Sequence, residues 1–441
     1  MSVSPPATPP RRAPHDSEWR FKTITSPCEW IEDYRPGGYH PVSLGDVFND
    51  GQFKVIRKLG DGAYSTVWLA RDLSNLRYVA LKILVSDITS PSYELQILHH
   101  LSEVAPQDGP QHVTQLLAEF EHDGPNGTHK CLVFEPMGPS ANSMVEELPQ
   151  FKPRKWGMKI RYPPQMARSI LKQSLQGLAF LHENGVAHGD FQPGNMLFAL
   201  KNIDAQDESE LRQEEDAAIG SISPPVERLD GKQDKWAPPY LCVAQPLSSF
   251  TDTTQDFKIK LSDMGGAYFL DNPIKKPVVP MGLRAPELIL NGAVDKSLDI
   301  WSFGCLVFEL VTGQPLFCVP WSESETDQDD DHLLTLNERL GPLPDELFRQ
   351  WKTSSLYFTP DKQLFNCQLG GVADGGEPLL LEQLSMEEAF DQANPDLTTE
   401  EAEKVKKLIR QILQYDPAKR PSAAELLRSA WFSEDAREKL D

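Results

Sequence analysis

The hydrophobic pattern of this chain changes its period near residue 136, and no other feature constrains the fold as strongly. Between about Phe53 and Phe134, short runs rich in β-branched and aromatic residues alternate with turn signals, as antiparallel strands do. A single helical stripe interrupts these runs, with apolar residues at Tyr93, Ile97 and Leu101. This part of the chain is therefore expected to be a small β unit that contains one helix.

Beyond residue 136 the apolar residues recur at helical spacing. Three- and four-residue steps run from Met166 to Leu181 and return in SLDIWSFGCLVFELVTG (297–313) and EEAEKVKKLIRQILQYD (400–416). A larger helical unit should follow the β unit. The sequence thus predicts the α+β class, with a small antiparallel β lobe and a larger helical lobe.

Composition suggests where these parts begin and end. Residues 1–24 are rich in proline and poor in aliphatic residues, which predicts a disordered tail, and two polar stretches within the helical part are expected to be solvated inserts. The predicted organisation is a tail at 1–24, an N-terminal extension at 25–52 that packs on the domain after it, an N-lobe at 53–135, a C-lobe at 136–433 with a polar spacer at about 199–256 and an acidic insert at about 322–332, and a C-terminal tail at 434–441.

The balance of charge favours a basic protein partner. With 65 acidic and 43 basic residues, the formal charge of −22 repels nucleic acid and anionic lipid but attracts basic proteins. The six cysteines contain no C-x-x-C pair, so neither a zinc site nor a disulfide framework is indicated. The chain has no apolar run of membrane-spanning length, and its start lacks an apolar signal segment. We therefore expect a reduced, intracellular protein.

Three candidates for a phosphate-binding site lie in the predicted β unit. The stretch Leu59–Val67 keeps a G-x-G pattern, which would let a β-turn lie against phosphates, although a plain hairpin turn explains it equally well. Lys82 ends an apolar strand and could clamp phosphates, while the alternative is a snorkelling surface lysine. Glu94, on the following helix, could hold Lys82 in an ion pair or could simply be solvated. None of these assignments stands alone.

Two downstream segments are more specific. In HGDFQPGN (188–195), Asp190 could accept a proton from an attacking hydroxyl, and Asn195 could coordinate a metal from the same loop. In KIKLSDMG (258–265), Asp263 ends a strand and would bridge magnesium to phosphates. Capping and turn roles are the alternatives. They lose weight because APE (285–287), DIWSFG (299–304) and Arg420 follow in order, with Glu287 expected to pair with Arg420 and Asp299 to brace the loop.

Taken together, these motifs resemble the eukaryotic protein kinases across roughly residues 53–433. The resemblance implies a two-lobed protein-kinase fold that binds ATP and Mg²⁺, with Asp190, Lys82, Glu94 and Gln192 as catalytic residues and Asn195 and Asp263 as magnesium ligands. It implies that Phe134 is a large gatekeeper and that Glu135 and Met137 offer backbone hydrogen bonds to adenine. The implied ATP-binding residues are Leu59, Gly60, Asp61, Gly62, Ala63, Tyr64, Ser65, Thr66, Val67, Ala80, Lys82, Phe134, Glu135 and Met137.

Finer features resemble the SR-protein kinases of the CMGC group. These are the sequence EDYRPGGYHPVSLGD before the first strand, GPNGTHKCLVFEPMG near the hinge, the polar spacer, and the acidic run that leads into HLLTLNERLG. The resemblance implies a serine/threonine kinase for Arg/Ser-rich protein segments, in agreement with the charge argument. We expect the carboxylates of 323–331 to attract such a peptide, with a steep dependence on salt.

The chain departs from the kinase pattern at several positions. Gln192 stands where most kinases have a lysine that contacts the γ-phosphate. The loss of this charged contact should raise the activation barrier by on the order of 2–3 kcal/mol, which slows the reaction roughly a hundredfold. Pro280 and Leu283 replace the usual threonine and tyrosine of the substrate-side loop. Gly189 replaces the arginine that binds a phosphorylated activation segment, and 266–282 contains no serine or threonine. We therefore expect activity without activation-loop phosphorylation.

Two alternatives stay open at this point. Gln192 and Pro280 would suit a pseudokinase that binds nucleotide without turnover, although Lys82, Glu94 and the other catalytic residues are all present. The local pattern H-G-D-F-x-x-x-N also resembles small-molecule phosphotransferases. We further expect a monomer that binds neither nucleic acid nor membrane directly, located in the cytoplasm, the nucleus or both.

Overall fold

The computed structural model describes residues 5–88, 93–106, 111–254, 256–290, 292–365 and 383–433. The predicted C-terminal tail, 434–441, lies outside the described residues. The chain forms two compact units. Unit 1 comprises 1–110, 114–139 and 197–257, and unit 2 comprises 111–113, 140–196 and 258–441. The predicted α+β class, with an antiparallel sheet in one lobe and helices in the other, is confirmed.

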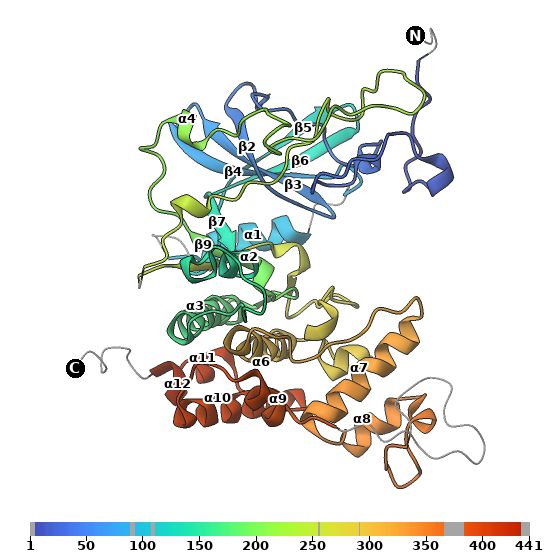
Figure 1. The fold of residues 1–441 in the computed structure, drawn as a ribbon, viewed down its shortest axis with the longest axis vertical. Coiled ribbons are helices and arrows are strands. Elements are labelled where there is room, and N and C mark those ends of the chain that lie inside the picture. The colour runs from blue at the N-terminus through green and yellow to red at the C-terminus, as the bar shows by residue number, and fades with distance from the viewer. Residues whose placement is uncertain are drawn as a thin grey trace. The chain divides into compact units, whose positions relative to one another are not determined.

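Unit 1 is built on an antiparallel sheet. Among the described residues the sheet has six strands in the order β1-β2-β3-β4-β6-β5, and helix α1 (Tyr93–Val104) packs against β5 (Figure 1). The strands are β1 (Val47–Phe48), β2 (Phe53–Gly62), β3 (Ser65–Asp72), β4 (Arg77–Leu84), β5 (Leu116–Gly124) and β6 (Gly127–Phe134). The short strands β7 (Met137–Ser140) and β9 (Met196–Ala199) are neighbours in a second sheet, and the short helix α4 (Glu208–Leu211) also belongs to this unit.

The two faces of the main sheet bury different residues. Side chains alternate between faces along a strand, so Val79, Leu81 and Ile83 of β4 point to one face, where they cluster with Val42 and Cys242. The other face has a separate apolar cluster, in which residues of the polar spacer also take part. Its buried members are Ile56, Leu69, Tyr78, Ile203, Leu211 and Leu247.

Residues 20–42, which we call the leading segment, and the spacer residues 199–256 therefore complete the core of unit 1. Phe21 is 3% exposed and forms a bridge with Arg228, and Leu241 joins Phe21 and Tyr39 in a third apolar cluster. The expected disorder of 1–24 does not describe Phe21, and the expected solvation of the spacer does not describe its buried residues such as Leu241. Each stretch is too polar to bury a core by itself, but each finds apolar partners in the other and on the sheet.

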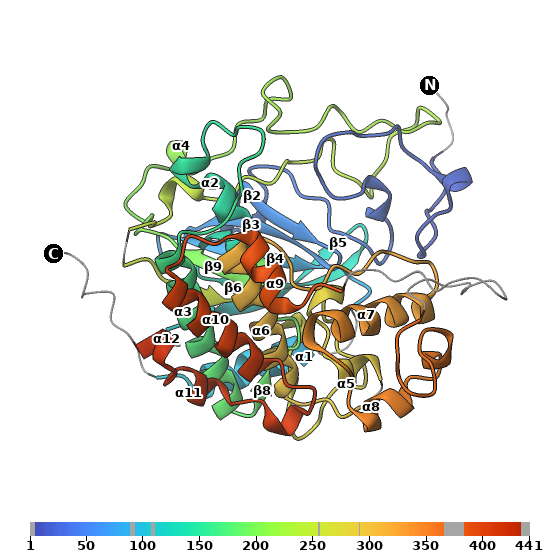
Figure 2. The ribbon, with the colours of Figure 1, turned by 60° about the horizontal axis from the view of Figure 1, so that its bottom comes forward.

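Unit 2 is mainly helical. Helices α3, α6 and α10 lie side by side at its centre in both views (Figure 1, Figure 2). The helices are α2 (Ala141–Glu147), α3 (Pro164–Glu183), α5 (Pro286–Ile289), α6 (Ser297–Thr312), α7 (Glu325–Leu340), α8 (Asp345–Gln350), α9 (Met386–Ala393), α10 (Thr399–Ile412), α11 (Ala423–Leu426) and α12 (Ala430–Ser433). The short strands are β8 (Val186–Ala187), β10 (Ile259–Leu261) and β11 (Tyr268–Phe269), and β11 pairs with β8.

Helix α6 is the buried axis of this unit. It is apolar around nearly its whole circumference, and 14 of its 16 residues are buried. Gly304 allows close packing, because a Cβ there would lie 2.6 Å from Ile412 Cγ2 of α10. Among the helices that the structure describes, none has the length and apolar character needed to cross a membrane. The burial of α6 means that any polar side chain on it must be satisfied by neighbouring segments.

Candidate active site

The glycine-rich stretch forms the hairpin that joins β2 to β3. Gly62 pairs with Ser65 and Asp61 with Thr66, so only Ala63 and Tyr64 lie in the turn. A Cβ added at Gly60 or Gly62 would meet no atom within 4 Å, and neither glycine has a positive φ. Neither folding nor packing therefore requires these glycines. The open space beside them fits a phosphate ligand, which would need the backbone amides uncovered.

Four predicted nucleotide-binding residues share one face of the main sheet. Val67 of β3 lies opposite Lys82 of β4, and Ala80 lies two residues before Lys82 and opposite Phe134 of β6. Residues directly opposite in an antiparallel pair, and residues two apart on one strand, point to the same side. This face is the opposite of the one that the leading segment and Cys242 cover.

Lys82 and Glu94 form the ion pair that the sequence suggested. Lys82 Nζ donates to Glu94 Oε1 at 2.7 Å, and the two side chains are 12% and 8% exposed. A snorkelling surface lysine is thereby excluded. Glu135 Oε1 accepts a hydrogen bond from the backbone N–H of Gln115 at 3.2 Å, and Met137 is buried at the start of β7. Their predicted contacts with adenine stay a prediction.

In unit 2, the loop after β8 gathers polar groups around Asp190. Asn195 Nδ2 donates to Asp190 Oδ2 at 2.9 Å, and Gln192 Nε2 donates to Asp190 Oδ1 at 2.8 Å. His188 Nδ1 accepts from the Asp190 N–H, while its Nε2 donates to the carbonyl of Ser262. Burial raises the pKa of Asp190 above its ordinary value, although the hydrogen bonds from Asn195 and Gln192 oppose that shift. Asp190 is thus oriented on both carboxylate oxygens.

The Asp299 carboxylate of α6 accepts hydrogen bonds from this loop. Its Oδ2 accepts from the N–H of His188 at 2.8 Å and from His182 Nε2 at 2.9 Å, and its Oδ1 accepts from the N–H of Gly189 at 2.9 Å. Burial opposes the charged form of Asp299, but the donors outweigh it and hold its pKa below the ordinary value. The expected bracing role of Asp299 is present as three hydrogen bonds.

Gly189 has a structural reason that the sequence did not reveal. Its φ is +72°, and a Cβ there would lie 2.1 Å from the carbonyl oxygen of Gly266. Gly266 follows the Asp-x-Gly strand and has less space to spare than an ordinary residue needs, since its own Cβ would lie 2.9 Å from Asp190 Cβ. The arginine of other kinases is therefore absent from a position where the backbone of this chain admits only glycine. The sequence around Gly189 gives no sign of this contact, because Gly266 lies far away in the chain.

The predicted magnesium ligands, Asn195 and Asp263, come from two sequence-distant segments that a backbone hydrogen bond joins. Ser262, the neighbour of Asp263, donates its N–H to the carbonyl of Asn195 at 2.9 Å. Asn195 Nδ2 is used on Asp190, which leaves the amide oxygen as its ligand atom. Asp263 has a φ of +60° and caps the turn that follows. One amide oxygen and one carboxylate suit Mg²⁺, which keeps most of its other ligands as water and phosphate oxygens. Within the described parts of the chain, no group of three or more His, Cys, Asp or Glu side chains is arranged to hold a metal.

A cavity of about 240 Å³ lies beside Gln192. Pro280 and Leu283, the two unusual residues of the substrate-side loop, line this cavity together with Glu309 of α6. Burial raises the pKa of Glu309, and no basic side chain within the described residues pairs with this carboxylate. Glu309 gives no functional signal in the sequence, because it sits in an apolar helical run and has no motif around it.

The structural pair predicted in the helical unit is also present. Arg420 Nη1 and Nη2 contact Glu287 Oε1 and Oε2 at 2.5 and 2.7 Å, and both side chains are almost fully buried. A bidentate pair satisfies both charges at a buried position. Arg420 also lies 4.8 Å from the ring centroid of Trp301. This pair supports the fold around the substrate-side loop rather than the chemistry.

The comparisons with known proteins point in one direction. The protein kinase domain family matches residues 53–207 and 250–432. The chain is 31% identical over 415 residues to the "Serine/threonine-protein kinase SRPK" of Physarum polycephalum, covering 92% of this chain and 91% of that protein. It is 27% identical to "Protein kinase dsk1" of Schizosaccharomyces pombe (96% and 88% covered) and 24% identical to human "SRSF protein kinase 3" (91% and 90% covered). A crystal structure of a kinase domain matches with a TM-score of 0.59 at 23% identity, covering 89% of this chain and 98% of that one, which bears on the fold alone.

Proposed function

Because the chain belongs to the protein kinase family, as a serine/threonine kinase of the SR-protein kinase type, we propose that it transfers the γ-phosphoryl group of ATP to hydroxyls in Arg-rich, Ser-containing protein segments. The named relatives are protein kinases, so the pseudokinase and small-molecule alternatives find no support.

One observation carries the choice of substrate: an unpaired carboxylate lines the cavity next to the catalytic loop. Glu309 is partly buried, and burial alone raises its pKa, so its charged form lacks a counter-ion. Gln192, which donates to Asp190, lines the same cavity. A guanidinium that entered here would supply the missing charge and a bidentate hydrogen-bond partner. An arginine near the acceptor serine therefore fits this site.

A second set of carboxylates lies on α7. Asp327, Asp329 and Asp331 have no ion-pair partner among the described residues, whereas Glu325 pairs with Lys276. The pKa values of Asp329 and Asp331 are raised, first by burial and then by the neighbouring carboxylates. Such a cluster favours binding of a cationic peptide, which would relieve the repulsion between like charges.

Asp330 differs from its acidic neighbours. It is 2% exposed and accepts hydrogen bonds from Trp351 Nε1, from the Thr353 hydroxyl and, at 3.1 Å, from the Tyr357 hydroxyl. This residue is part of the fold and cannot contact a peptide, so the acidic run 323–331 has both structural and exposed members.

The proposed role of each residue then follows from its geometry within its own unit. Asp190, oriented by Asn195 and Gln192, would accept the proton of the serine hydroxyl as it attacks. Asn195 and Asp263 would hold magnesium, which neutralises charge on the phosphates when it is bound. The glycine-rich hairpin, with Lys82 held by Glu94, would position the phosphates. Gln192 offers an uncharged donor where most kinases have a cation, which predicts slow turnover.

The first test is a phosphate-transfer assay with ATP-Mg and a peptide of alternating Arg and Ser. We expect serine phosphorylation that falls on the order of a thousandfold in Asp190→Ala, because the proton acceptor is removed. A matched peptide with Ala in place of Arg should be a poor substrate. Turnover equal in Asp190→Ala would contradict the assignment of the base, and equal use of both peptides would contradict the substrate proposal.

The second test separates the two acidic sites. Glu309→Gln should raise KM for the Arg-containing peptide and leave KM for the Ala peptide unchanged. Neutralising Asp327, Asp329 and Asp331 to Asn should raise peptide KM about tenfold at low salt and flatten its salt dependence. A control that neutralises three exposed acidic residues elsewhere, Asp16, Asp50 and Glu183, removes the same charge from other surfaces. If both triple variants behaved alike, net charge rather than α7 would explain the binding.

We also propose that the kinase acts as a monomer in the cytoplasm, the nucleus or both, since its substrate class is a basic intracellular protein. Light scattering of the purified chain and imaging of a tagged chain test these two statements. A stable dimer, or a tagged chain found on membranes, would contradict them.

A further inference from the structure

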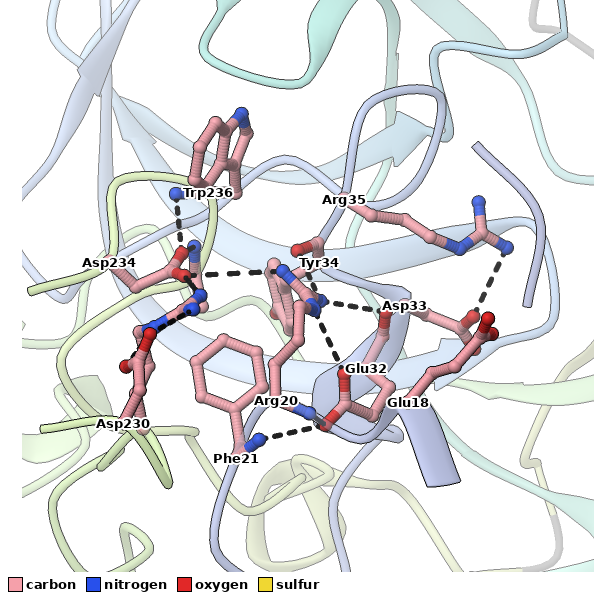
Figure 3. A network of polar contacts seen from close by, with 12 residues as sticks. Glu18, Arg20, Phe21, Glu32, Asp33, Tyr34, Arg35, Asp230, Asp234 and Trp236 are labelled. Atoms are coloured by element: carbon pink, nitrogen blue, oxygen red, sulfur yellow. Dashed lines mark hydrogen bonds and ion pairs between the residues drawn. The ribbon is translucent and has the colours of Figure 1, made fainter. Parts of the chain in front are cut away.

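The leading segment (20–42) is anchored on unit 1 by a buried carboxylate. Glu32 Oε1 accepts from the N–H of Arg20 at 2.6 Å and from the N–H of Phe21 at 2.9 Å, while Glu32 Oε2 accepts from Arg20 Nε at 3.0 Å (Figure 3). Arg20 Nη2 donates to the carbonyls of Glu32 and Tyr34, both at 3.0 Å. Arg20 also lies 4.0 Å from Asp234 of the spacer. Residues at the start of the leading segment therefore contact residues 32–34 of the same segment, and Arg20 also contacts the spacer.

A second anchor lies in the turn between β5 and β6. Asn126 is 3% exposed, and its Nδ2 donates to the carbonyls of Tyr39 and Trp236 at 2.6 and 2.7 Å. The Asn126 carbonyl in turn accepts from the N–H of Gly37 at 2.8 Å. One buried side chain thus joins the leading segment and the spacer to the sheet.

Between these anchors the segment reaches the glycine-rich hairpin. The Tyr39 hydroxyl donates to the carbonyl of Gly62 at 2.8 Å. Burial raises the pKa of Tyr39 to about 12, so its hydroxyl stays protonated and able to donate at neutral pH. Tyr39 itself is 5% exposed and packs against Tyr34, with ring centroids 5.6 Å apart. The contact therefore comes from a rigid side chain.

A buried ion pair makes the second contact with the hairpin. Lys58 of β2 is fully buried. Its Nζ lies 2.9 Å from Asp61 Oδ1 and also contacts the carboxylate of Glu29 in the leading segment. The Tyr34 hydroxyl donates to the other oxygen of Glu29 at 2.5 Å. Burial disfavours the charged form of Lys58, but Glu29 and Asp61 outweigh it and the pKa of Lys58 is raised. Asp61 of the hairpin thus forms an ion pair with the buried ammonium group of Lys58.

We propose that the leading segment positions the glycine-rich hairpin, with Tyr39 and the Glu29–Lys58–Asp61 chain as positioning residues for the phosphates of ATP. The two contacts fall on consecutive residues of the hairpin, Asp61 and Gly62, at the place where added side chains would meet only open space. A hairpin without such supports moves freely, and ordering it on binding lowers the apparent affinity for the nucleotide. The inference rests on the proposed binding of ATP at this hairpin.

The test compares two Tyr→Phe variants that remove only a hydroxyl. Tyr39→Phe deletes the hydrogen bond to Gly62. Tyr78→Phe is the matched control, because Tyr78 is 3% exposed in the same unit and its hydroxyl donates to a backbone carbonyl, that of Gln206, at 3.1 Å. The measurements are ADP affinity by calorimetry, KM for ATP, KM for the peptide, and hydrogen exchange of residues 60–65.

We expect Tyr39→Phe to weaken ADP binding and raise KM for ATP about three- to tenfold, the effect of one lost hydrogen bond, with peptide KM unchanged and faster exchange in the hairpin. Tyr78→Phe should change none of these. Equal nucleotide affinity in both variants would overturn the inference. An unmodified chain that bound no ADP or ATP would instead overturn the proposed function.

A second variant keeps the test independent of folding at Tyr39. Asp61→Asn removes the charge that Lys58 holds but leaves the side chain its size, so the hairpin loses one support. The double variant Tyr39→Phe/Asp61→Asn should weaken ADP binding by less than the product of the single effects, because a hairpin already released by one change has less order to lose. Strict multiplication of the two effects would show that they act separately and would contradict a shared positioning role.

Discussion

The catalytic loop and the glycine-rich hairpin are supported in different ways. The catalytic loop, 186–195, is held by Asp299, a residue of the most deeply buried helix, through three hydrogen bonds. The hairpin is held by Tyr39 and, through Lys58, by Glu29. Asp299 lies within the residues that match the kinase domain family, whereas Glu29 and Tyr39 precede the first matched residue, 53.

This difference teaches where a kinase chain can vary. A loop that carries the proton acceptor must stay in one place, so its support comes from the core of its own unit. A hairpin that covers phosphates must open for exchange, so a support from outside the matched kinase domain can adjust its mobility without disturbing the catalytic groups. The following experiments test the two kinds of support.

The largest effect should come from removing the support of the catalytic loop. Asp299→Ala leaves two backbone N–H groups and His182 without their acceptor, which should lower the free energy of unfolding on the order of 3–5 kcal/mol. Turnover should fall at least tenfold at temperatures where the variant is folded. Thermal unfolding and peptide phosphorylation measure these effects. The control Asp295→Ala removes an exposed carboxylate that accepts one hydrogen bond, from the N–H of Ser297.

The same carboxylate gives a pH dependence. The pKa of Asp299 in the folded protein lies below its ordinary value, so its contribution to stability is complete above the pKa of the unfolded chain, near 3.8. The contribution is lost as the pH falls through the lower, folded-state pKa. Denaturant unfolding between pH 6 and pH 3 should therefore show a steeper loss for the unmodified protein than for Asp299→Asn. Parallel curves would contradict the bracing role.

A second, smaller effect concerns Gly189. Gly189→Ala should cost about 2–4 kcal/mol, because the added Cβ meets the Gly266 carbonyl in a left-handed conformation. Gly185→Ala is the matched control: its φ is +76° but a Cβ there meets nothing within 4 Å, so only the backbone strain of about 1 kcal/mol applies. Equal melting temperatures for the two variants would mean that the contact with Gly266 has no energetic weight.

A change of up to roughly a hundredfold in rate is expected at Gln192. Gln192→Lys places a cation beside Asp190, whose pKa is raised by burial, and should lower that pKa. The base must be deprotonated to act, so the acid limb of the pH–rate profile should move to lower pH and kcat should rise by up to roughly a hundredfold. Gln192→Met removes the donor and should move the limb the other way. An unchanged acid limb in both variants would separate Gln192 from the base.

No effect at all is expected from phosphatase treatment. The segment 266–282 has no serine or threonine, Tyr268 is buried, and its hydroxyl donates to the carbonyl of Asp295. Gly189 offers no side chain to bind a phosphate. Activity measured before and after treatment should therefore be equal. Loss of activity would show that a modified residue elsewhere supports the catalytic loop.

The candidate site residues that have local signatures can be predicted from the sequence. Lys82 follows an apolar strand, Asp190 and Asn195 share one loop, and Asp263 ends another strand, so each could be found from its own neighbours. The ion pair of Lys82 with Glu94 was a reasonable expectation because helix and strand are adjacent in sequence, and the structure contains it. Glu309 and the reason for Gly189 could not be found, since each depends on a segment far away in the chain.

The burial of residues in the polar stretches could not be predicted from the sequence for the same reason. Composition predicts that residues 1–24 and the spacer cannot bury a core. This is correct for each stretch in isolation, but not for the two stretches together. Phe21 and Leu241 are buried because the two stretches meet in one apolar cluster. Likewise the acidic run 323–331 shows no sign that Asp330, unlike its neighbours, is enclosed by Trp351 and Tyr357.

The amino-acid sequence by itself determined the α+β class and the kinase family and supplied the candidate residues for the chemistry, because periodicity and motif spacing are local properties of the chain. Only the tertiary structure decided which residues support them: Asp299 under the catalytic loop, Gly266 against Gly189, and Tyr39 on the glycine-rich hairpin. These are pairings between distant segments, and the free energy of a hydrogen bond or a close contact depends on where both partners lie.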